Sequence, residues 1–451
     1  MENNKQPLQA SARYLAVEAL EKVFVSGAYS NLQLNRMIEQ HKLSNQDSRL
    51  LTNIVYGVIQ HRLTLEYWLA PFVANKKMDP WVQTLLLSAI YQRQYLDKIP
   101  DWAILNESIE IAKVRGHVGI RKFVTAILHQ ILRTKLGDFS EIKDPQKRLS
   151  IEYSIPLWLV ETLIEQYGQI SAETIIHSLN HPANQSVRVN SKLTTVDEML
   201  VELGDAGLTV HKSEVTPNAL TVEKGMIADL SQFQTGKITL QDESAMLAVE
   251  SMDLQPAFKV LDACAAPGGK TVQIASYLRQ GEGTVTALDI HTHKMKLIQQ
   301  NARRMQVDQL VDPELLDARK VDEKFADDSF DAILVDAPCS GLGLMRRKPE
   351  IRYEKKLADS LSLQKIQLSI LDSVAQKVKK GGIITYSTCT ILKQENDDVV
   401  TKFLANHPDF SLLTTKTKNN LKQERTTKTL TILPSDYNSD GFFVSNLKRN
   451  V

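Results

Sequence analysis

From residue 241 onward, short apolar runs rich in β-branched residues alternate with helical segments. Four of these runs are predicted strands: KVLDA (259–263), GTVTALD (283–289), FDAILVDA (330–337) and GGIITYS (381–387). Strands that alternate with helices form a parallel sheet with helices on both of its faces. The run GFFVSNLK (441–448) is expected to add an edge strand. We therefore expect a Rossmann-like α/β domain over residues 241–451.

The first part of the chain follows a different pattern. Residues 1–140 place apolar side chains at helical spacing, as in ARYLAVEALEKVF, and contain few alternating β-branched runs. This pattern predicts an all-α bundle. Gly137, Pro145 and Pro156 then interrupt it. A linker and a small α+β module, with strands at SVRVN and ALTVEKG, are expected over residues 141–240.

Charge and cysteine content narrow the classes of function. The chain has 451 residues, with 54 Lys+Arg against 53 Asp+Glu, but residues 1–150 hold 20 basic and 14 acidic side chains. A basic first third favours an anionic partner. Three cysteines cannot form a disulfide framework, which favours a reducing compartment such as the cytoplasm. No secretory signal and no run of 18 apolar residues are visible, which argues against a secreted or membrane protein.

The first predicted strand of the α/β domain leads into the turn C-A-A-P-G-G-K, residues 264–270. Gly268 and Gly269 allow a ligand to approach the backbone closely. A phosphate-binding loop needs glycine six residues before its lysine, but Cys264 stands at that position, and no G-x-G-x-x-G is present. The turn therefore suits a ligand without a pyrophosphate, and a strand–helix turn without any ligand is the alternative.

Two acids follow the next two strands. Asp289 ends the second strand, where a carboxylate can accept hydrogen bonds from ribose hydroxyls. Asp317, in ELLDARK, follows an expected third strand between the runs 283–289 and 330–337, which makes those two runs the second and fourth strands, and it can meet an adenine amine. An ordinary surface acid is the alternative for either one alone. Taken with the turn, the two acids favour an adenosine cofactor without a phosphate cradle, which suggests S-adenosylmethionine.

Two cysteines follow the fourth and fifth strands: Cys339 in DAPCSG and Cys389 in YSTCT. The carboxyl ends of parallel strands line the active crevice of such a sheet. A free cysteine is usually packing material, but two of them in polar turns at adjacent strand ends favour chemistry. Zinc is the rival interpretation, although neither C-x-x-C nor a spaced histidine pair accompanies the thiols, so no metal is expected.

A thiolate beside a methyl donor suits methylation of cytosine. C5 of the base is too poor a nucleophile to take a methyl group unaided, but a thiolate that adds to C6 moves electron density onto C5. A base must then remove the C5 proton so that the thiol leaves. Asp336, in the turn before Cys339, is placed to hold the N3 edge of the ring.

Three motifs resemble the RNA cytosine-5 methyltransferases of the Sun/Nop2 type: LDACAAPGGKT, DAPCSGLG followed by RRKPEIRY, and YSTCT followed by Glu395-Asn396. HPANQSVRVN and FQTGKITLQDESAM resemble the segment ahead of that family's catalytic domain. The resemblance implies that Cys389 is the nucleophile, that Cys339 assists product release, and that Asp336 acts with them. The cofactor contacts that it implies are Cys264, Ala265, Ala266, Pro267, Gly268, Gly269, Lys270, Asp289, Asp317 and Asp336. Thr390 replaces the family's usual serine.

The segments NESIEIAK (106–113) and KFVTAIL (122–128) resemble the NusB-like RNA-binding module. Within the family, this module ahead of the catalytic domain marks bacterial enzymes that modify 16S rRNA, which implies an rRNA partner, a role in rRNA processing and a cytoplasmic monomer. The same chemistry on tRNA or another RNA, and a non-catalytic NusB-like assembly factor, are the alternatives. Candidate phosphate contacts are Arg13, Arg115, Arg121 and Lys122, and, after the Cys339 turn, Arg346, Arg347 and Lys348.

Overall fold

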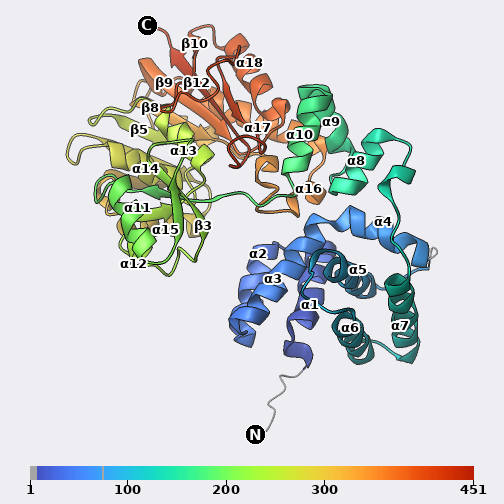
Figure 1. Cartoon of the computed structure of the whole chain (residues 1–451). Helices are drawn as coiled ribbons and strands as arrows, with labels where there is room; N and C mark the ends of the chain where they lie inside the picture. The colour runs from blue at the N-terminus through green and yellow to red at the C-terminus, as the bar shows by residue number, and fades with distance from the viewer. Residues whose placement is uncertain (1–7, 74–75) are drawn as a thin grey trace. The chain divides into compact units, whose positions relative to one another are not determined.

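The structure, a computed structural model, describes residues 8–73 and 76–451. It divides into two compact units, each described here by itself. The helical unit contains the described residues up to Asn180 together with Lys348–Glu354, and the sheet unit contains His181–Arg347 and Lys355–Val451. The chain thus enters the sheet unit after Asn180, returns to the helical unit at Lys348, and leaves it again after Glu354. Figure 1 follows this path by colour.

The helical unit confirms the all-α prediction for the first part of the chain. Its helices are α1 (Ala12–Ser26), α2 (Ser30–His41), α3 (Asn45–Gln60), α4 (Arg62–Val73), α5 (Pro80–Tyr95), α6 (Asp101–Arg115), α7 (Val118–Arg133), α8 (Pro145–Tyr153), α9 (Leu157–Tyr167), α10 (Gln169–Ser178) and α16 (Ile351–Glu354), with short 3₁₀ turns η1 (Leu8–Ala10) and η2 (Phe139–Glu141). Helices α1 to α7 share one apolar core in which Leu15, Ile54 and Leu86 are fully buried. Helix α3 ends at Gln60 and α4 begins at Arg62, with His61 between them.

The segment Lys348–Glu354 belongs to the helical unit although it is distant in sequence. Glu350 accepts hydrogen bonds from the Ser30 backbone N–H (3.1 Å) and hydroxyl (2.8 Å), at the first turn of α2. The fully buried Arg352 donates to the carbonyls of Gln60, Ser154 and Leu179, each at 3.3 Å. Those carbonyls end α3, α8 and α10, and helix C-termini carry partial negative charge. Glu350 therefore caps the positive N-terminal end of α2, and Arg352 caps the negative C-terminal ends of α3, α8 and α10.

Within the sheet unit, residues up to 240 form a small antiparallel sheet in the order β2-β3-β1-β4. Its elements are β1 (Gln185–Val189), α11 (Val196–Asp205), β2 (Thr209–Lys212), β3 (Ala219–Lys224), α12 (Ser231–Gln234) and β4 (Ile238–Leu240). Helix α11 begins with a capping box, because Thr195 and Glu198 each bond the other's backbone N–H. The sequence predicts β1, β3 and α11, but not β2 and β4, which are too short to show a clear period.

The large sheet has the order β10-β12-β9-β8-β5-β6-β7, with β11 paired to β12. Its strands are β5 (Lys259–Asp262), β6 (Thr284–Asp289), β7 (Val311–Leu315), β8 (Phe330–Asp336), β9 (Val378–Thr388), β10 (Phe410–Leu413), β11 (Leu430–Ile432) and β12 (Phe442–Arg449). Strands β5 to β9 pair in parallel, as predicted. The prediction of an edge strand at GFFVSNLK is wrong. Strand β12 is antiparallel to both β9 and β10 and lies between them. Nearly all of its side chains are buried, as expected for an interior strand.

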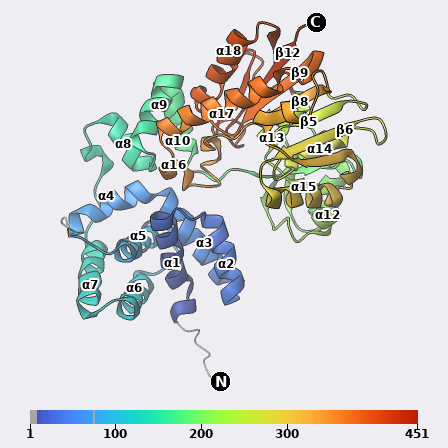
Figure 2. The ribbon, with the colours of Figure 1, turned by 180° about the vertical axis from the view of Figure 1, so that it is seen from behind.

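Helices cover both faces of this sheet. The covering helices are α13 (Glu243–Glu250), α14 (Gly269–Tyr277), α15 (Thr292–Arg304), α17 (Leu357–Ala375) and α18 (Asp397–Asn406), and the short turns are η3 (Asp308–Leu310), η4 (Ala318–Glu323), η5 (Leu342–Leu344) and η6 (Lys393–Glu395). Successive residues of β5 point to opposite faces. Val260 packs in the core with α13–α15, and Leu261 packs in the core with α17 and α18. Figure 2 shows the ribbons of these helices around the sheet. From β5 the chain adds β6 and β7 on one side of the sheet and then β8 and β9 on the other side. The ligand crevice of a sheet with such a reversal is expected beyond the carboxyl ends of β5 and β8.

Candidate active site

The two predicted cysteines lie together where β8 and β9 end. Cys389 follows β9 directly, Cys339 lies three residues beyond β8, and their Sγ atoms are 3.2 Å apart. All three cysteines of the chain are free thiols. The hydrogen bond to Cys389 is the main cause that raises the pKa of Cys339, and burial adds to it. The geometry thus brings a neutral thiol at Cys339 into contact with the Cys389 sulfur.

A lysine–aspartate pair lies in the same crevice. Lys270 Nζ is 2.8 Å from Asp336 Oδ2, and the Ser387 hydroxyl donates to Asp336 Oδ1 at 2.8 Å. Burial lowers the pKa of Lys270, but the charge and the hydrogen bond of Asp336 outweigh burial and raise that pKa above its ordinary value. The ammonium also lies 5.0 Å from the centre of the Phe442 ring. The pairing of Lys270 with Asp336 was not predicted, because it joins two turns that lie far apart in the sequence.

The turn after β5 has room for a ligand. Gly268 has φ +101°, a conformation that favours glycine, and a Cβ on it would meet the Ile298 Cα at 3.0 Å. A Cβ on Gly269, the first residue of α14, would meet nothing within 4 Å. The position that a side chain of Gly269 would take is therefore open. The residues present fit a small cofactor that approaches the backbone here.

The two predicted cofactor acids differ in how many of their lone pairs are already used. Asp289 Oδ1 accepts the His291 N–H at 2.9 Å, and Oδ2 is 3.9 Å from Lys294 Nζ. The Asp317 carboxylate accepts four hydrogen bonds from Arg319, between 2.6 and 3.2 Å, and these hydrogen bonds lower its pKa. Asp289 thus keeps more capacity to bind ribose hydroxyls than Asp317 keeps for an adenine amine.

Asp262, at the end of β5, is an acid that the sequence did not single out. It is 1% exposed, its Oδ2 accepts the Thr271 hydroxyl at 2.7 Å, and its Oδ1 is buried without a hydrogen-bond partner. Burial raises its pKa to about 7, and the Thr271 hydrogen bond offsets only part of that rise. Burial likewise raises the pKa of the Cys264 thiol, two residues further on. A weakly acidic Cys264 thiol is a poor nucleophile.

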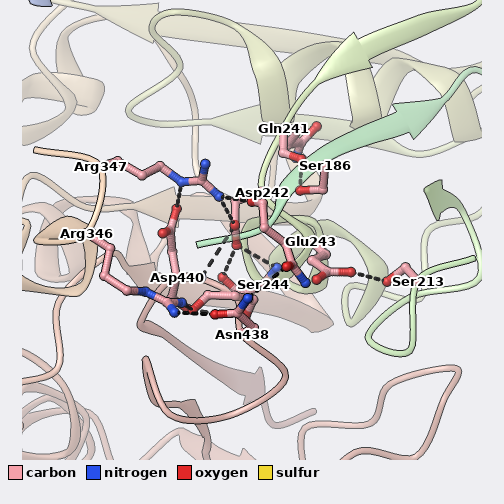
Figure 3. Close-up of polar contacts among 12 residues, drawn as sticks. Ser186, Ser213, Gln241, Asp242, Glu243, Ser244, Arg346, Arg347, Asn438 and Asp440 are labelled. Atoms are coloured by element: carbon pink, nitrogen blue, oxygen red, sulfur yellow. Dashed lines mark hydrogen bonds and ion pairs between the residues drawn. The ribbon is translucent and has the colours of Figure 1, made fainter. Parts of the chain in front are cut away.

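Arg346 and Arg347, expected to meet substrate phosphates, are bound to groups of this chain. Arg347 Nη2 lies 2.7 Å from Asp242 Oδ2, and its Nε lies 2.5 Å from Asp440 Oδ2 (Figure 3). Arg346 donates to the Asn438 side chain at 2.6 Å and to the Ser439 carbonyl. Lys348 belongs to the helical unit. The Arg346 and Arg347 side chains therefore hold the fold, which sequence alone could not reveal because the acceptors are about 90 residues or more away.

Two of the four candidate RNA contacts of the helical unit are also bound to groups of this chain. Arg13 bonds Glu107 at 2.6 Å, and Arg115 bonds Glu21 at 2.7 Å, so both are internal ion pairs. Arg121 and Lys122 line a shallow surface hollow with Ile109 and Thr125. Arg13 and Arg115 are thus paired with acids of the bundle, while the exposed Lys122 and the half-buried Arg121 line an open hollow where phosphates can be contacted.

Two further findings concern metal binding and membrane-spanning helices. In the described parts of the chain, no group of three or more His, Cys, Asp or Glu side chains is arranged to hold a metal ion. Among the helices that the structure describes, none combines the length and the apolar character needed to cross a bilayer.

A sheet with this strand order, helices on both faces, a glycine turn after β5 and an acid at the end of β6 defines the Rossmann-like methyltransferase class, here preceded by a NusB-like helical domain. The sequence matches the family "16S rRNA methyltransferase RsmB/F" over residues 249–448, the NusB family over 10–133, and the ferredoxin-like domain of RsmF/B-like methyltransferases over 155–228. The chain belongs to the ribosomal RNA small subunit methyltransferase B family, whose members depend on S-adenosylmethionine.

Relatives support this assignment over the full length. A Bacillus subtilis (strain 168) protein named "Probable ribosomal RNA small subunit methyltransferase B" is 43% identical over 98% of this chain and 99% of its own. The ribosomal RNA small subunit methyltransferase B of Klebsiella pneumoniae (strain 342) is 30% identical over 96% and 97%. The crystal structure of PH0851 superposes with a TM-score of 0.83, 27% identity and 99% coverage of both chains.

Proposed function

We propose that this chain transfers a methyl group from S-adenosylmethionine to C5 of a specific cytosine in 16S rRNA, through a covalent bond between Cys389 and C6 of the base. One observation carries the proposal: the Cys339 and Cys389 sulfurs lie 3.2 Å apart at the ends of adjacent parallel strands. Packing does not require two thiols in contact at the crevice where such sheets bind ligands, whereas reversible addition to a pyrimidine uses one thiol to attack and a second group to manage protons.

The Cys389 thiolate forms a bond to C6, and the electrons of the C5–C6 double bond move toward C5. S-adenosylmethionine supplies an electrophilic methyl group, which C5 takes. A base then removes the C5 proton, the double bond re-forms, and the C6–sulfur bond breaks to return the thiolate. The hydrogen bond to Cys389 and burial raise the pKa of Cys339, which favours a neutral thiol there, and Cys389 takes the role of nucleophile that the family resemblance implies.

The Lys270–Asp336 pair is proposed to orient the base. Asp336 has one oxygen on Lys270 and the other on Ser387, each at 2.8 Å, so its carboxylate is held from both sides. A carboxylate fixed in this way can accept a hydrogen bond from the exocyclic amine of cytosine, next to N3. The turn residues 264–270 and the acids Asp289 and Asp317 would hold the cofactor.

The RNA substrate is proposed from the relatives and from the helical unit. The named relatives are ribosomal RNA small subunit methyltransferases, and the NusB-family match covers residues 10–133. Arg121 and Lys122 are available for phosphates on the surface of the helical unit. The same chemistry on tRNA or another RNA is the second candidate, and a non-catalytic assembly factor is the third.

Mapping 5-methylcytosine in total RNA from cells with and without the gene tests the proposal. We expect one cytosine of 16S rRNA to lose its methyl group. The assay is repeated in vitro with purified protein, S-adenosylmethionine, and 16S rRNA or tRNA. Loss of a tRNA methyl group would favour the second candidate, and an unchanged map together with no transfer in vitro would favour the third.

A second arm tests the covalent step. The Cys339→Ala variant is expected to accumulate a protein–RNA adduct that survives denaturing electrophoresis, because the group that assists release is gone. The double variant Cys339→Ala, Cys389→Ala is expected to form none. An adduct that persists without Cys389 would show that another residue is the nucleophile.

A further inference from the structure

Two adjacent buried residues stand behind the thiol pair. Glu395 ends η6 and is 0% exposed, and Asn396 precedes α18 and is 1% exposed. Both are polar, and neither has a part in the chemistry proposed above. Burial of an amide or a carboxylate is costly unless its atoms are hydrogen-bonded, so their partners indicate what they do.

Glu395 holds the Cys339 turn. Its Oε2 accepts the backbone N–H of Ser340, the residue after Cys339, at 2.8 Å. The same oxygen accepts Gln367 Nε2 at 3.0 Å, and this Gln367 nitrogen also donates to the Pro338 carbonyl, the residue before Cys339, at 2.9 Å. Oε1 accepts the Ser360 hydroxyl at 2.8 Å. The backbone on both sides of Cys339 is thus tied to one carboxylate, directly or through Gln367.

Asn396 holds the Cys389 turn in the same manner. Its Oδ1 accepts the Thr388 hydroxyl at 2.5 Å, and its Nδ2 donates to the Thr390 carbonyl at 3.0 Å. Cys389 lies between those two residues. The Ser340 and Thr390 hydroxyls, 2.8 Å apart, join the two turns directly.

We propose that Glu395 and Asn396 act as a latch that fixes the distance between the two sulfurs, Glu395 by holding the Cys339 turn and Asn396 by holding the Cys389 turn. Both are positioning residues, because their side chains bond the residues on either side of the cysteines. Because the two are neighbours in the chain, the peptide bond between them couples the two turns. The catalytic consequence rests on the proposed function, but the distance between the sulfurs does not.

The identity of each latch residue follows from its partners. The partners of Glu395 are all donors, so a carboxylate with two acceptor oxygens satisfies them and an amide, which presents an N–H₂ on one side, does not. Asn396 faces one donor and one acceptor, so an amide satisfies both and a carboxylate would place an oxygen against the Thr390 carbonyl. Glu395→Gln and Asn396→Asp therefore break the latch with almost no change in shape.

The test compares these two variants with matched controls on exposed sites of α18, Asp398→Asn and Asn406→Asp. The first readout is independent of RNA. The thiol oxidant diamide takes two electrons and two protons from two thiols, and intact mass with peptide mapping follows formation of the Cys339–Cys389 disulfide. We expect its rate to fall about 10-fold or more in the latch variants and to stay at the wild-type value in the controls, because bond formation requires contact between the sulfurs.

The second readout separates positioning from general structural damage. With a methylated RNA substrate identified as above, kcat is expected to fall about 100-fold, because a shift of about 1 Å at reacting atoms has that effect, while KM for S-adenosylmethionine stays unchanged. Thr388→Val, which removes only the hydroxyl that bonds Asn396, is the milder variant to use if the others fail to fold, and it should change both readouts in the same direction.

Wild-type rates of disulfide formation in folded latch variants would overturn the latch. An unchanged kcat with slowed disulfide formation would overturn the catalytic consequence of the latch, because the spacing would then not matter for turnover. If wild-type protein methylates no RNA, the proposed function fails, and the disulfide readout still decides whether the latch sets the spacing of the sulfurs.

Discussion

The cysteine turns of the sheet unit and the α6–α7 surface of the helical unit are both expected to meet RNA, yet they are built in opposite ways. Around the thiols, several polar side chains each bond more than one partner, as Asp336 and Glu395 do. On α7, Lys122 is exposed and Arg121 lines an open hollow. Chemistry at one carbon atom needs fixed geometry, whereas attraction to a phosphate backbone needs only charge near the surface. Single substitutions should therefore have large effects at the turns and small effects on the helices.

The largest effect is expected from Cys389→Ala. Without the nucleophile, C5 is not activated, so methyl transfer should fall by more than about 10⁴-fold. Affinity for S-adenosylmethionine, measured by calorimetry, should be retained because Cys389 is not one of the predicted cofactor contacts. Turnover near the wild-type rate would remove Cys389 from the mechanism.

The helical unit has one site where a single substitution should also be severe. Arg352→Met keeps the side-chain volume but leaves the carbonyls of Gln60, Ser154 and Leu179 buried without this donor. We expect a loss of about 3 kcal/mol or more in the free energy of unfolding, measured by urea titration. Arg148→Met, at an exposed position on α8, is the control and should be nearly neutral. Equal stability of the two variants would show that Arg352 is not an anchor.

The two predicted cofactor acids of the sheet unit, Asp289 and Asp317, are expected to differ in how much they contribute to cofactor affinity. Asp289→Ala should weaken S-adenosylmethionine binding about 10- to 100-fold, as expected for loss of a charge-assisted hydrogen bond. Asp317→Ala should weaken it less, because Arg319 already occupies that carboxylate. Calorimetry on both variants, with the exposed Asp308→Ala as control, measures the difference. The reverse order would contradict the assignment.

Burial of acids in the sheet unit predicts a pH dependence of stability. Burial raises the pKa of Asp262 from 3.8 to about 7, so the folded state holds a proton that the unfolded state has already released. The stability that this proton gives is complete below about pH 4 and is lost as the pH rises to about 7. Asp262→Asn should remove that loss. Between pH 5 and pH 8, the unfolding free energy of the variant should therefore fall by about 2 kcal/mol less than that of wild type.

Glu243 and Asp440, whose pKa values burial also raises to about 7, are unchanged in this variant, so the difference from wild type isolates Asp262. Asp253→Asn, at an exposed site, is the control. Parallel pH profiles for Asp262→Asn and wild type would show that Asp262 is ionised in the folded protein.

The smallest effect is expected on the helical surface. Charge reversal at Arg121 and Lys122 should weaken binding of an rRNA fragment about 10-fold at low salt, with a shallower salt dependence and no change in kcat. The same reversal at Lys147 and Arg148, exposed on α8, is the matched control. Equal weakening by both pairs would mean that overall charge, not the α7 surface, attracts the RNA.

The sequence alone determined most of the architecture and the position of the chemistry. Apolar runs rich in β-branched residues and helical spacing are local signals, so β5, β6, β8, β9 and the helices of the bundle were predictable. The same signals placed Cys339 and Cys389 at the ends of neighbouring strands, because parallel strands present their carboxyl ends at one edge of the sheet. The turn at 264–270 and its glycines are likewise local.

Only the tertiary structure decided which side chains meet. The segment RRKPEIR, residues 346–352, contains three arginines that sequence alone does not distinguish. Arg347 bonds Asp242 and Asp440 within the sheet unit, while Arg352 caps three helices of the helical unit. Strand β12 is interior because β10 and β11 pair with it. The contact between Ser30 and Glu350 spans 320 residues. No local pattern encodes such pairs, because hydrogen bonds between distant segments depend on how the whole chain packs.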